Sequence, residues 1–123
     1  MRFLSPEWLD AAAELAATVP VDGVPRATVL QRITGGPDGD HAHRIVVDGG
    51  LELRPGTGDQ ADVTLTESWD TAVAINRGTL TPHRAVMSGL VLVEGDLEMI
   101  SELAPVFTGI AAALDGLRAG TTF

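Results

Sequence analysis

The 123-residue sequence contains neither cysteine nor lysine. The absence of cysteine excludes disulfides and thiol catalysis, and it agrees with the cytoplasmic location that we expect. The absence of lysine excludes Schiff-base chemistry on a lysine amine. Eight arginines stand against seventeen acidic residues, which gives a net charge of −9. Because nucleic-acid binding needs a basic face that neutralises phosphates, we expect no nucleic-acid partner.

Long apolar runs and aromatic side chains are also scarce. The longest apolar runs, such as residues 110–114, are far shorter than the roughly 20 residues that span a bilayer, so we expect no stable membrane insertion. We also expect no secretory signal, because residues 1–6 lead directly into a helix start. Two tryptophans and three phenylalanines are the only aromatic residues, although 45% of the chain is apolar. Small and flexible side chains must therefore fill the core of the single domain expected for residues 1–123.

Hydrophobic periodicity and turn residues predict five strands and about five helices. Alternating or β-branched segments between Gly- and Pro-rich turns indicate strands at residues 27–34, 41–48, 51–53, 61–66 and 90–94. Capping residues and apolar stripes indicate helices at residues 5–18, 68–78, 81–89, 96–103 and 105–120. No pairing of a nucleophile with a base accompanies these elements, so we do not expect an enzyme.

The order and spacing of short motifs between residues 61 and 99 carry the most information. These motifs are residues 62–66 (DVTLT), Gly78 with residues 80–82 (LTP), residues 85–89 (AVMSG) and residues 95–96 (GD). Together they resemble the sterol carrier protein type 2 family of small lipid-binding domains. The abundance of Ala, Gly, Asp, Val and Arg further indicates a GC-rich genome and a bacterial member of that family.

The resemblance implies an α+β fold, in which a curved, five-stranded, mostly antiparallel sheet is covered on one face by helices. An apolar cavity is expected between the two layers. The implied function is non-catalytic binding or transfer of a sterol, fatty acid, fatty acyl-CoA or similar lipid, without a cofactor or metal. One departure concerns the position after Gly89, where many relatives have a basic residue and this chain has Leu90. The resemblance therefore implies no contact with an anionic headgroup at that position.

Eight apolar side chains on the helices of the second half are expected to line the cavity: Trp69, Val73, Val86, Met87, Met99, Leu103, Phe107 and Ile110. The alternative is that they form an ordinary core. Methionine adapts to ligands of variable shape, and a dry apolar cavity accepts an apolar guest. Burying some sixteen methylenes contributes roughly 13 kcal/mol, whereas association costs on the order of 4–15 kcal/mol. Apolar contact alone can therefore support a tolerant lipid site.

Polar residues would serve only to orient a headgroup. His83 and Arg84 follow a helix start, where free backbone N–H groups favour a carboxylate or phosphate; the alternative is an exposed first turn. His41 and His43 share one strand face, as chelation requires, but a solvated hairpin end is the better interpretation. Residues 35–39 are glycine-rich without the Lys-Ser/Thr ending of a phosphate loop, so they are interpreted as a hairpin turn.

Two other functions stay open at this point. The domain could be a stand-alone accessory or catalytic subunit acting on an apolar substrate, which requires polar groups converging in the cavity, with His83, Arg84 and Asn76 as candidates. Alternatively, it could be a homodimeric interaction module that pairs through its first or last helix, using Phe123 and the apolar stripe around Val106. The sequence leaves the choice between monomer and homodimer undecided.

Overall fold

The computed structural model describes residues 1–58 and 60–123. This part of the chain forms one five-stranded sheet: β1 (Ala27–Gly36), β2 (Gly39–Val47), β3 (Leu51–Pro55), β4 (Val63–Ser68) and β5 (Val91–Gly95). Its helical elements are four α-helices and a terminal 3-10 helix: α1 (Pro6–Ala16), α2 (Trp69–Arg77), α3 (Pro82–Met87), α4 (Leu97–Leu114) and η1 (Asp115–Gly120). The predicted α+β class and the five strands are thereby confirmed.

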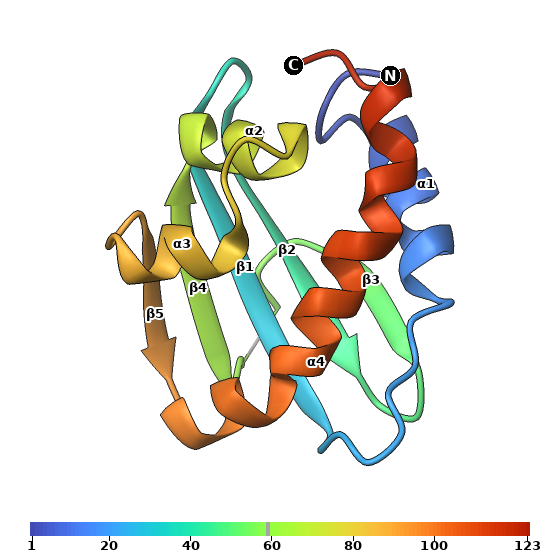
Figure 1. The fold of residues 1–123 in the computed structure, drawn as a ribbon, viewed down its shortest axis with the longest axis vertical. Helices are drawn as coiled ribbons and strands as arrows, with labels where there is room; N and C mark the ends of the chain where they lie inside the picture. The colour runs from blue at the N-terminus through green and yellow to red at the C-terminus, as the bar shows by residue number, and fades with distance from the viewer. Residues whose placement is uncertain (59) are drawn as a thin grey trace.

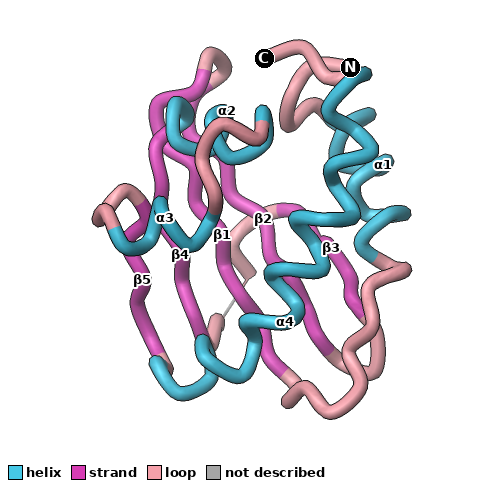
Figure 2. The backbone as a smooth tube through the Cα atoms, in the orientation of Figure 1, coloured by secondary structure: helices cyan, strands magenta, loops and turns pink. Residues whose placement is uncertain are grey.

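The sheet has the strand order β3-β2-β1-β4-β5. The central pair β1–β4 is parallel, and the three other pairs are antiparallel. The helices lie on the same face of the sheet, with α4 running diagonally across it, α2 over the ends of β1 and β4, and α3 beside β5 (Figure 1). The two termini lie side by side at one end, where an isolated bridge pairs Arg2 with Thr122. The tube in Figure 2 makes the two layers, helices over strands, easy to follow.

The last two predicted helices are one continuous helix, α4, with Pro105 inside it. A break at Pro105 was expected because proline lacks the N–H that continues the helical hydrogen bonds, which costs about 3 kcal/mol. Leu103 and Val106 flank this proline, and both are fully buried against the sheet. Each buried side chain of this kind contributes about 1.5–3 kcal/mol, so their joint burial offsets the lost hydrogen bond.

The unbroken apolar runs are short, as predicted, but α4 together with η1 still forms a long and mainly apolar helical stretch. The stretch Leu97–Gly120 is long and apolar enough to cross a membrane by length and composition alone, with a mean hydropathy of 1.4. Unbroken runs are short there because isolated acids such as Glu98 and Glu102 interrupt them. One such stretch is weak evidence for insertion, and α4 lies on the sheet here (Figure 1), although only 11% of the apolar window is buried.

The buried apolar residues form two clusters on the helix-covered face. The larger one joins α4 to the middle of the sheet through residues such as Val29, Ile45, Val63 and Leu103. The smaller one joins the N-terminal segment and α2 to the end of β1. It is rich in rings, for Phe3 lies with its ring centroid 5.0 Å from that of Trp8, 5.2 Å from Trp69 and 5.3 Å from Phe123.

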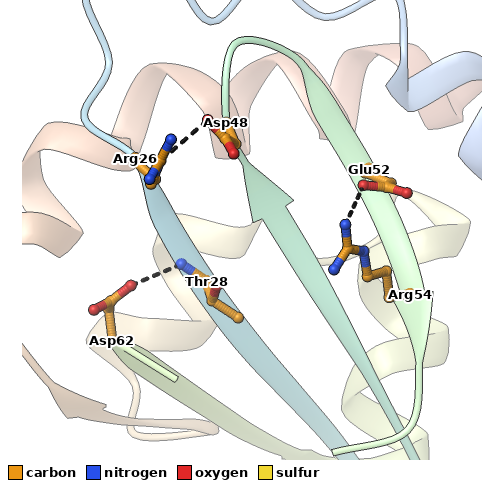
Figure 3. Close-up of polar contacts among 6 residues, drawn as sticks. All are labelled: Arg26, Thr28, Asp48, Glu52, Arg54 and Asp62. Carbon is orange, nitrogen blue, oxygen red and sulfur yellow. Dashed lines mark hydrogen bonds and ion pairs between the residues drawn. The ribbon is translucent and has the colours of Figure 1, made fainter. Parts of the chain in front are cut away.

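Asp62, the first residue of the DVTLT motif, ties three elements together. Its carboxylate accepts a hydrogen bond from the backbone N–H of Thr28 at 2.8 Å, as Figure 3 shows, and its own N–H donates to the carbonyl of Thr28 at 2.9 Å. Its carbonyl accepts from the N–H of Asp96 at 3.1 Å. Gly95 adopts a φ of 108° beside this carbonyl, and a Cβ there would clash with it. The motif therefore fixes how β4 begins beside β1 and β5.

We predict that Asp62→Ala lowers the free energy of unfolding by about 1–2 kcal/mol, because it removes a charged acceptor from the Thr28 N–H. Glu52→Ala is the matched control, since it also removes a carboxylate but breaks only the exposed ion pair with Arg54 seen in Figure 3. The control should change stability by less than about 1 kcal/mol. Urea denaturation of both variants checks this, and equal effects would contradict the role given to Asp62.

Candidate functional site

Four polar side chains lie on the helix-covered face of the sheet, where apolar residues would be expected. Because strand residues alternate between faces, Gln31 of β1, His41 and His43 of β2 and Glu67 of β4 point to the same side as the apolar core residues of their strands. His43 is 8% exposed and Glu67 is 5% exposed. We call these four residues the polar row. The row crosses three neighbouring strands.

Strand register brings the members of the row together. Gln31 lies opposite His43 in the antiparallel β1–β2 pair and opposite Leu65 in the parallel β1–β4 pair. Its side-chain amide donates a hydrogen bond to Oε1 of Glu67, with Nε2 and Oε1 2.6 Å apart. His41 Nε2 and His43 Nδ1 are 2.9 Å apart and share a hydrogen bond. The second carboxyl oxygen of Glu67, Oε2, is buried and has no hydrogen-bond partner within residues 1–58 and 60–123.

Burial changes the protonation of three of these groups. It lowers the pKa of His43 to about 4, with a further lowering by the neighbouring His41, whose own pKa is also lowered by burial. Burial raises the pKa of Glu67, although the hydrogen bond from Gln31 acts in the opposite direction. Both imidazoles are therefore neutral at neutral pH, and none of the four side chains is a cation.

The polar row lies beside both apolar clusters. Val29, Ile45 and Val63, farther along the same three strands, belong to the larger cluster. Ile33 of the aromatic cluster lies between His41 and Glu67, opposite each of them in the strand register. Gln31, Leu65 and Val93, which follow one another across β1, β4 and β5, stay partly exposed, although they point toward the helices. The helices therefore cover this part of the sheet less completely than the rows on either side.

Two open hollows lie at the end of the sheet near the chain termini. One has a volume of about 500 Å³ and is lined by Phe3, Gly36, Trp69 and Phe123, among others. The other has a volume of about 240 Å³ and is lined by residues including Phe3, His41 and Trp69. A Cβ on Gly36 would come within 2.9 Å of the Trp69 ring, so this glycine lets the indole lie directly on the β1–β2 hairpin. The polar row thus begins, at His41, in the wall of a hollow lined by aromatic rings.

The eight apolar residues predicted for the ligand do not share one surface. Met99, Phe107 and Ile110 are partly buried against the larger cluster around the fully buried Leu103. Trp69 and Val73 belong to the aromatic cluster. Val86 and Met87 lie at the surface of α3, 44% and 73% exposed. Of the eight, Trp69 lines the described hollows.

The polar candidates on α3 and α2 lie apart from the polar row. His83 and Arg84 are exposed, and the backbone N–H of Arg84 is already bonded to the capping hydroxyl of Thr81 at 3.2 Å. The amide of Asn76 donates to the carbonyl of Ala72 within α2, at 2.8 Å. The three residues therefore do not form the converging group that the enzyme alternative required.

Two sequence interpretations need correction. The hairpin end was expected to leave both histidines in solvent, but His43 is buried beneath the helices because it continues the inward alternation of Ile45 and Val47. Glu67 was not singled out at all. The strand alternation of residues 63–67 indicates its position, because Glu67 follows Val63 and Leu65 at every second residue and so puts a carboxyl group on the apolar face of β4. Within residues 1–58 and 60–123, no group of three or more His, Cys, Asp or Glu residues is placed to hold a metal ion.

Comparison with known proteins identifies the family. The family model described as the SCP-2 sterol transfer family matches residues 26–108. The chain belongs to the SCP-2 sterol transfer family. This match confirms the predicted resemblance to sterol carrier protein type 2, and it spans β1 through most of α4. No curated protein matches the sequence.

Solved structures show that the fold of the SCP-2 domain is shared with distant relatives. In a crystal structure of sterol carrier protein 2, the chain shares 14% sequence identity with this one, and the two folds align with a TM-score of 0.74. The alignment covers 93% of this chain and 98% of the sterol carrier protein chain. A solution structure of palmitated SCP2L2 from Aedes aegypti is 22% identical, with a TM-score of 0.68, covering 85% and 95%. The structure of a sec-alkyl sulfatase variant aligns with 24% sequence identity and a TM-score of 0.57. This alignment covers 87% of the present chain but only 16% of the sulfatase chain. At these identities the likeness is one of fold.

We predict that the buried imidazole of His43 makes stability depend on pH between about 4 and 6.5. The unfolded state binds a proton below the ordinary pKa of 6.5, whereas folded His43 resists protonation down to a pKa of about 4. The contribution of neutral His43 to the free energy of unfolding is thus fully present above pH 6.5. It decreases by up to roughly 3 kcal/mol as the pH falls toward 4. Urea denaturation at several pH values should show a smaller loss for His43→Gln than for the unmodified protein.

The difference between the unfolding free energies of the unmodified protein and the His43→Gln variant, taken at each pH, isolates the contribution of His43. Glu67 acts with the opposite sign, because its raised pKa contributes stability at low pH that is lost as the pH rises above its ordinary value of 4.5. Parallel pH profiles for the two proteins would show that His43 is hydrated in solution.

Proposed function

We propose that this domain binds an apolar, lipid-like ligand between its helices and its sheet, without catalysing a reaction. Membership of the SCP-2 sterol transfer family supports binding or transfer of a lipid in general. The observation that carries the proposal is the incomplete cover over Leu65 and Val93, two apolar side chains that point toward the helices and stay partly exposed. The palmitated Aedes aegypti relative has the same fold and supports an acyl chain as the kind of guest.

The apolar face of α4 supplies the other wall of the proposed site. Met99, Phe107 and Ile110 pack against the same cluster as Leu65 and Val93 and are themselves only partly buried. Trp69 and Val73 belong to the proposed lining on the aromatic side, which leads to the hollow of about 500 Å³. A volume of this size lies within the range of small-molecule sites in proteins, about 300–1,000 Å³. His83 and Arg84 remain outside this lining, at the surface of α3.

We predict that delipidated protein binds Nile red, an uncharged apolar dye, and that Phe107→Ala weakens this binding about tenfold. The lost contact corresponds to about 1.4 kcal/mol, at the low end of what burying a phenylalanine contributes. Met87→Ala is the matched control, because Met87 is 73% exposed on α3, and it should leave the affinity unchanged. Fluorescence titration measures both.

Native mass spectrometry of untreated protein provides an independent check and should show a copurified apolar ligand. Absence of any adduct together with no binding of Nile red would exclude the proposal.

A second candidate is a stand-alone subunit acting on an apolar substrate, which the match to part of a sec-alkyl sulfatase favours. Because the chain corresponds to only 16% of that enzyme, we expect no release of sulfate from a secondary alkyl sulfate by the purified protein. Ion chromatography of sulfate checks this, with acid-hydrolysed substrate as the positive control. Turnover that Glu67→Gln abolishes would replace the binding proposal with an enzymatic one.

The proposed dimer contacts are used within the chain. Val106 is 1% exposed, and the ring of Phe123 packs on Phe3 and under the guanidinium of Arg77, 5.1 Å from its centroid. The choice between monomer and homodimer and the cytoplasmic location stay predictions from the sequence.

A further inference from the structure

We propose that Gln31 and Glu67 form the subsite that anchors the polar end of the ligand, and that this subsite selects an uncharged hydroxyl headgroup over a carboxylate. The inference rests on the proposed function and specifies the headgroup class and the residues that hold it. Its starting point is the direct contact between the two side chains, in which Nε2 of Gln31 lies 2.6 Å from Oε1 of Glu67.

The position of the pair suits a headgroup at the end of an apolar chain. Gln31 faces Leu65 across the β1–β4 pair, and Glu67 faces Val91 across the β4–β5 pair. Leu65 and Val93 lie opposite each other on β4 and β5, next to the pair, and remain partly exposed. An apolar chain lying on Leu65 and Val93 would therefore end at polar groups that apolar residues surround.

The pair has unused hydrogen-bonding capacity. Oε2 of Glu67 is buried and has no hydrogen-bond partner among the described residues, and Glu67 as a residue is only 5% exposed. Buried polar groups are normally paired, so this oxygen calls for a partner. The amide of Gln31 carries two N–H donors, of which the described contact with Glu67 uses one. A hydroxyl group can donate to Oε2 and accept from the second amide N–H, whereas a carboxylate can only accept.

Charge around the pair also opposes an anionic headgroup. His43, opposite Gln31, is neutral at neutral pH because burial lowers its pKa to about 4. Arg44 neighbours this region in sequence but points to the other face of the sheet, where its guanidinium donates to the carbonyl of Pro55 at 3.1 Å. A carboxylate at the pair would thus meet the Glu67 carboxyl group with neither His43 nor Arg44 to compensate its charge, and buried unpaired charge is strongly unfavourable.

The test compares 1-dodecanol with dodecanoate, two ligands that differ only in the headgroup. Each displaces Nile red from delipidated protein at pH 7.5. We expect dodecanol to bind at least tenfold more tightly than dodecanoate. Glu67→Leu and Gln31→Leu should each weaken dodecanol binding about tenfold. Neither should weaken dodecanoate binding, and Glu67→Leu, which removes the opposing carboxyl group, should if anything strengthen it, so the ratio of the two affinities falls toward one.

Two controls keep the result interpretable. Glu94→Gln changes a carboxylate on the opposite face of β5 and should preserve the affinity ratio. Glu67→Gln keeps the size of the side chain, so it provides a folded variant if the leucine substitution unfolds the protein, and it should still reduce the ratio. Circular dichroism establishes that each variant is folded.

The outcomes separate this subsite from the proposed function. Equal affinities for the two ligands, tighter binding of dodecanoate, or an unchanged ratio in folded Glu67 and Gln31 variants would overturn the subsite while leaving lipid binding intact. Failure of Nile red and both ligands to bind would overturn the subsite together with the proposed function.

Discussion

The parallel pairing of β1 with β4 is the constraint on which the rest of the structure depends. The two strands are distant in the sequence, yet they form the centre of the sheet, with β2 and β5 on their outer edges. Asp62 fixes where this pairing starts by bonding Thr28 on both its N–H and its carbonyl. The register that follows from this start places Ile33 opposite Glu67 and Gln31 within hydrogen-bonding distance of it. A shift of one residue would turn each of these side chains to the other face.

A polar row inside an apolar layer is unfavourable for stability unless its members are paired. Gln31 with Glu67 and His41 with His43 satisfy much of this requirement, but in the part of the chain that the structure describes Oε2 of Glu67 has no partner. Burial also keeps both histidines neutral, which avoids placing charge within the apolar layer. An unsatisfied group in a region that the helices cover incompletely is the kind of local conflict that natural proteins keep at functional sites.

Much of the apolar side-chain surface lies outside the buried core. The helix α4 is the most apolar segment, yet among its residues only Leu103 and Val106 are fully buried. Further apolar residues are exposed on α3, on β5 and at the start of α4: Val86, Met87, Leu90, Leu92 and Leu97. The high net charge of −9 keeps such a surface compatible with solubility, because like-charged molecules repel one another.

The sequence by itself determined the α+β class, the five strands and the family, because alternation, caps and turn glycines are local signals. Thr81, Ser68 and Asp96 cap the helices predicted for them, since a capping side chain needs only its own next three residues. Tertiary structure decided the rest. Pro105 lies inside a helix because the sheet buries the residues beside it, and His43 is buried because helices distant in the sequence cover its strand. The contact between Gln31 and Glu67 exists only through strand register, which depends on the whole sheet and on no local pattern.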